Sequence, residues 1–235
     1  KTSAKSTRIV RFEFSTTQAY IIEFGDLYCR FYKDHGQIIS GTPVEIVTPY
    51  VEADLFNLQF TQSADVLYIT HQSYAPRKLS RTSHTAWTLT EIDFLDGPYL
   101  ATNASTTTLT LSATSGSVTV TASAVTGINS DTGFQTTDVG RLIRWKDPAN
   151  NWTWLEITAR ATTTSITATI RGPNASAGTA TVNWRLGVWS DTTGYPGAVV
   201  FYEDRLFLGG PTSYPQRLDG SKSGDYENMA PSAAD

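Results

Sequence analysis

The chain has 235 residues, of which 40% are hydrophobic and 17% charged, a charged share below the roughly 25% of average soluble domains. Its formal net charge of -4 leaves no basic surplus for broad neutralisation of nucleic-acid phosphates, so no nucleic-acid site is expected. A single cysteine, Cys29, excludes an internal disulfide and a cysteine-based zinc site, and no apolar run approaches the ~20 residues of a membrane-spanning helix.

The first 40 residues are predicted to form an antiparallel meander. Apolar and charged residues alternate over 8–14, as in a half-buried strand. Residues 18–24 and 27–32 form the next strand pair, with a tight turn at Gly25-Asp26, and a short strand follows at 37–39. Cys29 lies inside an apolar and aromatic run, which favours a strand position over a reactive thiol.

The next segment mixes a short helix with further strands. Residues 51–58 (VEADLFNL) permit one or two helical turns, because Ala53, Leu55 and Leu58 are compatible with helical spacing. No other helix is expected. Strands are then predicted at residues 59–61, 66–71, 77–81 and 87–93.

The composition changes sharply near residue 100. No Lys or Arg occurs between Arg81 and Arg141, and Thr, Ser, Ala and Gly dominate residues 101–137. Strict alternation places four apolar side chains on one face of two strands: Leu109, Leu111, Val118 and Val120. Further strands are expected at residues 139–145, 152–159, 165–171 and 179–186. Six short strands over residues 101–186 predict a small β-barrel or sandwich; the alternative, a disordered Thr-rich linker, does not explain the alternation.

The last part of the chain contains a clear hairpin. Residues 198–202 and 205–208 are apolar, and only Glu203-Asp204 separates them, the length of a tight turn. A third short strand is expected near 216–218. Because the chain begins with Lys1 and its only methionine is Met229, we expect it to be an excised fragment or a processed chain.

These patterns predict an all-β fold: an antiparallel sheet domain interrupted by an inserted small β-barrel, with at most one short helix near residues 51–58. The predicted organisation has three parts. Residues 1–100 form the N-terminal domain, 101–186 the inserted barrel, and 187–235 a return to the first domain and the start of a further, truncated sheet.

The sequence offers no catalytic, cofactor-binding or metal-ligating constellation, and we predict that the protein is not an enzyme. There is no phosphate loop, nucleophile elbow or dinucleotide fingerprint. The histidines lack metal-ligand spacing and are interpreted as surface residues: His35, His71 and His84. Two groups of acids are interpreted as turn residues rather than a glycosidase pair: Glu91, Asp93 and Asp96, and Glu203 and Asp204.

Tryptophans gather around the barrel and its exit: Trp145, Trp152, Trp154, Trp184 and Trp189. The favoured interpretation is that they fill the core and its junction, because each indole buries a large apolar area. The alternative is a carbohydrate-binding surface, on which exposed rings stack against sugars.

Several long phrases resemble the tail tubular, or nozzle, proteins of phages. They include RFEFSTTQAYIIEFGDLYCRFYKDHGQI, WTLTEIDFLDGPYL and WSDTTGYPGAVVFYEDRLFLGGPTSYPQRLDGSKSGDYEN, and the resemblance covers residues 8–100 and 185–229. It implies a tail component of short-tailed phages or prophages that assembles as a ring and has propeller-like sheets. In that case residues 187–235 contain the start of a truncated propeller-like sheet. The family's Gly- and Asn-rich start is absent here.

The Thr-rich module, residues 101–186, weakly resembles the first catalytic cysteine half-domain of ubiquitin-activating enzymes. This resemblance concerns the fold alone, because the module contains no cysteine and Cys29 lies outside it. It implies no activity and no ATP site.

The predicted function is therefore structural: a phage or prophage tail protein that assembles with identical subunits and other tail proteins. Its expected location is the virion tail, or the bacterial cytoplasm during assembly or when expressed from a prophage. The candidate interaction residues are Trp152, Trp154, Tyr195, Tyr202, Arg205, Tyr214 and Arg217. The alternative function is a tail module that binds a host-surface glycan. No cofactor is predicted.

Overall fold

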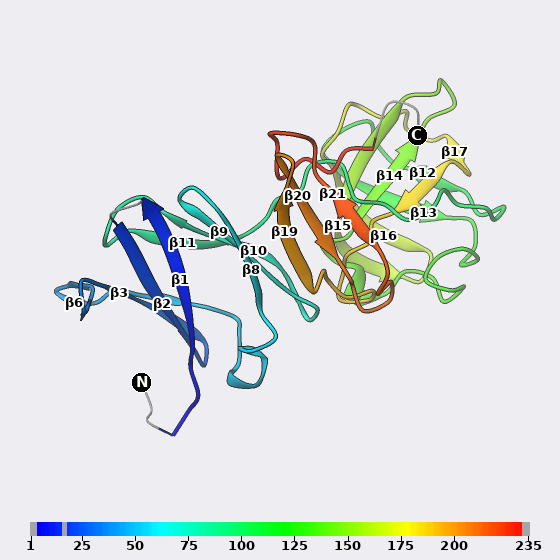
Figure 1. Cartoon of the computed structure of the whole chain (residues 1–235). Helices are drawn as coiled ribbons and strands as arrows, with labels where there is room; N and C mark the ends of the chain where they lie inside the picture. Colours follow the sequence, from blue (N-terminus) through cyan, green and yellow to red (C-terminus); the bar gives the residue numbers. More distant parts are fainter. Residues whose placement is uncertain (1–3, 16–17, 232–235) are drawn as a thin grey trace. The chain divides into compact units, whose positions relative to one another are not determined.

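The protein has an all-β fold, as the sequence predicts (Figure 1). The structure, a computed structural model, describes residues 4–15 and 18–231. Within these residues the sheets are antiparallel, and the helical segments are two 3-10 turns, η1 (Glu52–Asp54) and η2 (Thr136–Asp138). The expected helix at 51–58 thus reduces to η1, although Leu55 and Leu58 are fully buried behind it.

The chain divides into two compact units, each made of two pieces of sequence. The first unit comprises Lys1–Asp93 and Tyr195–Leu218, and the second comprises Phe94–Gly194 and Asp219–Asp235. The sequence patterns predict an inserted barrel with boundaries at residues 101 and 186.

The first sheet of the first unit follows the order β1-β2-β3-β4, with β7 paired to β3. Its strands are β1 (Arg8–Ser15), β2 (Gln18–Gly25), β3 (Tyr28–Lys33), β4 (Gly36–Gln37) and β7 (Glu45–Val47). A two-stranded ribbon of β5 (Ile39–Ser40) and β6 (Thr42–Pro43) lies between β4 and β7 in the chain.

A second sheet follows the order β11-β10-β9-β8 and completes the core of this unit. Its strands are β8 (Gln59–Ser63), β9 (Val66–His71), β10 (Tyr74–Arg81) and β11 (Trp87–Glu91). Side chains from both sheets meet in one apolar cluster, where Phe31 of β3 stacks on Trp87 of β11 with ring centroids 4.2 Å apart. Two antiparallel sheets that bury one face each are the expected solution for alternating strands.

The predicted hairpin forms β19 (Ala198–Tyr202) and β20 (Arg205–Gly209), joined by Glu203-Asp204 as expected. Both turn residues have positive φ, 45° and 57°, which suits the twist of a two-residue hairpin. The third strand, β21 (Leu218–Gly220), begins two residues later than the start of the expected segment, because Gly210 and Arg217 close a hydrogen-bonded loop before it. Likewise, Gly25 pairs with Tyr28, so the β2–β3 turn is Asp26-Leu27 rather than Gly25-Asp26.

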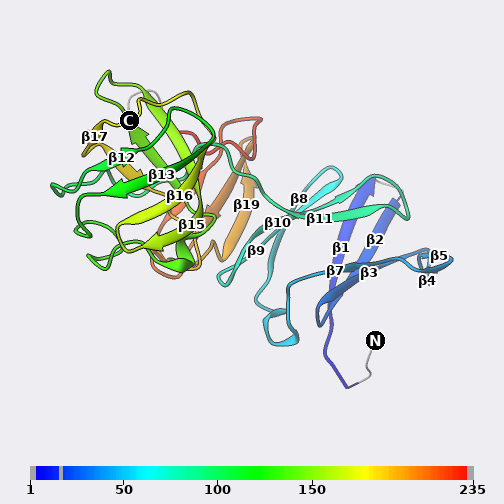
Figure 2. The ribbon, with the colours of Figure 1, turned by 180° about the vertical axis from the view of Figure 1, so that it is seen from behind.

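The second unit contains one seven-stranded, nearly closed, barrel-like sheet, seen at the green and yellow part of the ribbon in Figures 1 and 2. Its order is β17-β12-β13-β16-β15-β14-β18. The strands are β12 (Leu109–Leu111), β13 (Ser117–Ala122), β14 (Leu142–Lys146), β15 (Trp152–Thr162), β16 (Ser165–Ile170), β17 (Ala180–Thr181) and β18 (Trp184–Leu186). The Thr-rich segment is therefore sheet, not linker.

Alternating residues of these strands fill the interior, and two tryptophans join its walls. Leu109, Leu111 and Val120 are fully buried, as their alternation predicts. Trp145 and Trp184 also point inward, and their indole nitrogens donate to the carbonyls of Leu109 at 3.1 Å and Thr107 at 3.0 Å. Each ring thus supplies apolar volume and satisfies a buried carbonyl.

A buried ion pair holds the loops at the start of β14. The Nη1 atom of Arg141 lies 2.9 Å from Oδ1 of Asp138, and both side chains are about 1% exposed. Asp138 also accepts from the Thr192 hydroxyl at 2.8 Å and from the backbone N–H of Gln135 at 2.8 Å. Arg141 donates through Nε to the carbonyl of Gly187 at 2.7 Å. Sequence reasoning missed this pair, although Arg141 is the first cation after Arg81.

Asp138→Asn is expected to lower the free energy of unfolding of the second unit by about 3–5 kcal/mol, because it leaves a buried guanidinium without its carboxylate. Adding Arg141→Met should restore part of that loss. Denaturant unfolding followed by near-UV circular dichroism measures both effects.

The control is Glu13→Gln, which breaks the exposed Arg11–Glu13 pair and should cost at most about 1 kcal/mol. Equal costs for Asp138→Asn and Glu13→Gln would show that the buried pair has no special role.

Candidate interaction surfaces

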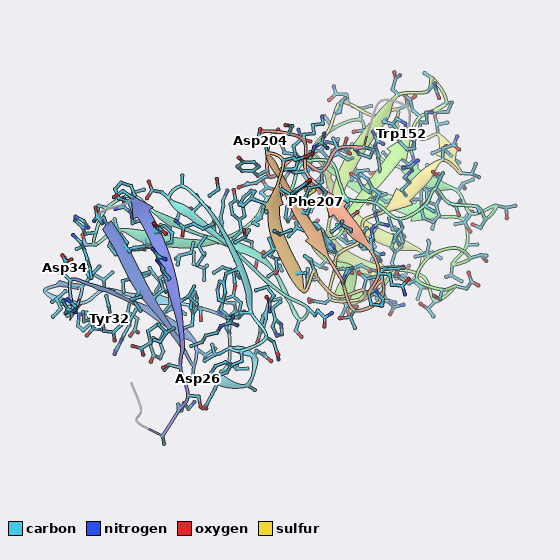
Figure 3. The ribbon with its side chains drawn as sticks, viewed as in Figure 1. Asp26, Tyr32, Asp34, Trp152, Asp204 and Phe207 are labelled. Atoms are coloured by element: carbon cyan, nitrogen blue, oxygen red, sulfur yellow. The ribbon has the colours of Figure 1, made fainter. Side chains whose placement is uncertain are left out.

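The outward-facing residues of β14, β15 and β18 form a surface of cations and indoles, which we call the basic–aromatic face. Residues that alternate with the buried Ile143, Trp145 and Leu155 must point outward. The face consists of Arg144 and Lys146 on β14, Trp152 and Trp154 on β15, Arg171 after β16, and Arg185 on β18. Figure 3 labels Trp152 among the side chains of this unit.

Trp152 and Trp154 are not core residues, which corrects the favoured interpretation for these two rings. Both are half-buried, and Trp152 is surrounded by positive charge. The guanidinium of Arg144 lies 4.7 Å from its ring centroid, the ammonium of Lys146 5.1 Å and the guanidinium of Arg185 5.8 Å. These distances are within cation–π range, so the cations are attracted to the indole.

Trp154 has a separate cationic neighbour. The guanidinium of Arg171 lies 5.5 Å from the ring, and Arg171 also forms an ion pair with Glu156. Trp145, Trp184 and Trp189, in contrast, are buried. The preference for core burial therefore holds for three of the five tryptophans considered.

Arg144 is the most unusual member of the basic–aromatic face because it is only 7% exposed. Its Nε lies 3.5 Å from Oδ1 of Asp96, too poorly aligned for a hydrogen bond, and its guanidinium lies 5.9 Å from the Tyr99 ring. Both Nε and Nη1 are buried without a hydrogen-bond partner. Arg144 also pairs directly across the sheet with Arg185, and like charges in that position repel.

A second candidate surface is the outer face of the β19–β20 hairpin, which we call the hairpin face. Val200, Tyr202 and Leu218 are 53%, 62% and 66% exposed. Phe207 lies beside Tyr202, with ring centroids 6.5 Å apart, and Figure 3 labels Phe207 and the turn residue Asp204. Arg205 pairs with Tyr202 across the turn.

The remaining candidate interaction residues, Tyr195, Tyr214 and Arg217, lie in loops before and after the hairpin. The backbone N–H of Tyr195 donates to the carbonyl of Gln72 at 3.0 Å, so Tyr195 is tied to the β9–β10 turn. Tyr214 and Arg217 belong to the loop between β20 and β21, where the backbone N–H of Arg217 donates to the Tyr214 carbonyl at 3.0 Å. Five of the seven predicted residues thus belong to the first unit, while Trp152 and Trp154 belong to the second.

A polar groove of about 590 Å³ in the first unit contains His71, which is buried rather than a surface residue as predicted. The backbone N–H of Ser73 donates to Nδ1 of His71 at 3.1 Å, and Nε2 lies 3.8 Å from Asp54. Asp54 in turn accepts from the Tyr74 hydroxyl at 2.7 Å. Burial lowers the pKa of His71, and the Asp54 carboxylate partly opposes that shift. The fold thus uses the imidazole for its own hydrogen bonds.

Acidic residues that were weighed as a possible catalytic pair form turns or ion pairs in the structure. Glu203 and Asp204 form the hairpin turn, and Glu91 pairs with Arg77. Among the described residues, no group of three or more His, Cys, Asp and Glu side chains is placed to hold a metal ion. None of the helical segments described is long and apolar enough to cross a membrane.

Cys29 is expected to resist thiol reagents in the folded protein. It is fully buried in β3, and burial raises its pKa to about 12, so little thiolate exists at neutral pH. Labelling with a maleimide should be slow in buffer and fast in denaturant, as measured by intact-mass spectrometry. Rapid stoichiometric labelling of the native protein would contradict this placement.

The burial of His71 predicts a pH-dependent contribution to stability. Because its folded pKa is lowered from the ordinary 6.5, this contribution is fully present above about pH 6.5 and is lost as pH falls through the folded pKa. His71→Asn, whose side-chain oxygen can still accept from Ser73, should flatten the fall in unfolding free energy from about pH 7.5 to about pH 5.

The matched control is His35→Asn, because His35 is an exposed turn residue with a φ of 64° that Asn also tolerates. If both variants retain the pH dependence of the parent, the contribution does not come from His71. Denaturant titrations at several pH values provide the measurement.

Comparison with protein-family models finds no match, and comparison with curated proteins finds none either.

Proposed function

We propose that this protein is a structural component of a phage or prophage tail, similar to tail tube or nozzle proteins. It acts by assembly with identical subunits and other tail proteins, in the virion tail and in the bacterial cytoplasm before assembly is complete. The support for the tail assignment is the sequence resemblance over residues 8–100 and 185–229. The all-β architecture is compatible with it.

The hairpin face carries the assembly proposal. Val200, Tyr202 and Leu218 gather on one sheet surface with Phe207, and each of the first three is more than half exposed. Contiguous exposed apolar groups of this kind mark interaction sites more often than scattered single residues do. Aromatic side chains with a polar tip, such as Tyr202, are also enriched in protein–protein interfaces.

Val200→Asp is expected to weaken self-association of the purified chain, because it places a carboxylate in the apolar face. The parent chain should associate only weakly at micromolar concentration and more strongly as the concentration rises. Sedimentation velocity over a concentration series measures this dependence.

Val47→Asp is the matched control, since Val47 is a strand valine that is 80% exposed and lies outside the hairpin face. Association that is unchanged by Val200→Asp, or reduced equally by Val47→Asp, would contradict the role of this face. A stable hexamer at micromolar concentration would contradict weak association. The tail assignment is tested separately by whether portal, adaptor and terminase genes flank the coding sequence.

A second candidate function, attachment to a host-surface glycan, is favoured by Trp152 and Trp154. Both rings are half-buried on the outer side of β15, two residues apart, where a sugar chain can reach them. Glycan-array binding that disappears in Trp152→Ala and Trp154→Ala would favour this function over a purely structural one.

A further inference from the structure

We propose that the basic–aromatic face of the second unit binds an acidic polysaccharide, a sugar chain with carboxylate groups. This inference rests on the second candidate function, glycan attachment, and specifies the chemical class of the glycan. It is independent of the hairpin face.

The first argument is the local excess of positive charge. Four cationic side chains lie on this face: Arg144, Lys146, Arg171 and Arg185. Arg171 pairs with Glu156, and Arg144 lies 3.5 Å from Asp96. Among the described residues, Lys146 and Arg185 have no carboxylate partner; Arg185 donates through Nε to the Thr102 hydroxyl at 2.8 Å. Within the part of the chain that the structure describes, Lys146 and Arg185 thus place two positive charges on this small area without a carboxylate, although the whole chain has a net charge of -4.

The second argument is the incomplete hydrogen bonding of Arg144. Two of its three guanidinium nitrogens are buried without an acceptor, and its one ion pair is long. A buried charged donor without a partner costs more than an exposed one, and the Arg185 charge across the sheet adds repulsion. A carboxylate that accepts from the more exposed Arg185 would reduce that repulsion and place a negative charge near the Arg144 guanidinium.

The third argument separates a sugar chain from a nucleic acid. A nucleic-acid strand carries a phosphate about every 3.4 Å and needs many cations for appreciable affinity, whereas this face has two uncompensated charges. Trp152 and Trp154 lie on the same side of β15, about 7 Å apart along the strand. Apolar ring surfaces beside a few charges match a chain of sugar rings in which only some groups are ionised.

The experiment is affinity electrophoresis of the intact chain in native gels that contain polygalacturonate, dextran or no polymer. Polygalacturonate should retard the protein, and added salt should reduce the retardation. Dextran, which is uncharged, should have much less effect. Single-stranded DNA as a soluble competitor should release the protein only weakly.

Arg185→Gln and Lys146→Gln should each weaken polygalacturonate binding about tenfold, the loss of one charge-assisted hydrogen bond. The matched control is Arg160→Gln. Arg160 is also half-buried in the same sheet and donates through Nε to one oxygen, the Phe134 carbonyl at 3.1 Å, but lies outside the basic–aromatic face. Arg160→Gln removes one positive charge, as the two test variants do, so it also corrects for the change in electrophoretic mobility that the lost charge causes.

Three results would overturn the inference: no retardation of the parent by polygalacturonate, equal weakening by Arg160→Gln, or tighter binding to single-stranded DNA than to polygalacturonate. A different result would keep the glycan function but reject the preference for an acidic polymer. In that case dextran retards the protein, Trp152→Ala abolishes the retardation, and Arg185→Gln leaves it unchanged. If no polymer retards the protein, neither the glycan function nor this inference survives. Near-UV circular dichroism checks that each variant is folded.

Discussion

The second unit depends on one fully buried ion pair, Asp138–Arg141. Removing two charges from water costs several kcal/mol per ion, so such a pair persists only where further hydrogen bonds satisfy both groups. Here Gln135, Thr192 and Gly187 supply those bonds. The pair therefore ties the loop before β14 to the segment that leaves the barrel-like sheet. β14 begins at the residue after Arg141, Leu142, and its register with β15 decides which of its residues point inward.

The consequence is clearest at the neighbouring residues Arg144 and Trp145. In a strand, successive side chains point to opposite faces, so a shift of one residue would exchange them. In the present register Trp145 fills the interior and donates to Leu109, while Arg144 joins the basic–aromatic face. The same alternation separates Thr153 from Trp152 and Trp154 on β15. The register of β14 and β15 thus determines both the core and the candidate ligand surface.

The sequence predicts what depends on local pattern and leaves open what depends on contacts between distant residues. Alternation predicts the buried Leu109 and Leu111, and Glu203-Asp204 predicts the hairpin turn. The pattern cannot show that Asp138 meets Thr192 and Arg141 meets Gly187, or that His71 is buried, because polar residues are buried only when partners from other elements surround them. The cations around Trp152 come from two strands, β14 and β18, so only the order of strands in the sheet brings them to β15.

The hairpin face and the basic–aromatic face depend on different physical forces. Burial of Val200, Tyr202 and Leu218 would be driven by the hydrophobic effect, which moderate salt strengthens or leaves unchanged. Attraction of a ligand to Lys146 and Arg185 is Coulombic, and salt screens it over about 10 Å at 0.1 M. Since Arg144 also repels Arg185, ligand binding at that face would relieve repulsion that the fold retains in its absence. Opposite responses to salt therefore distinguish assembly from ligand binding in the same chain.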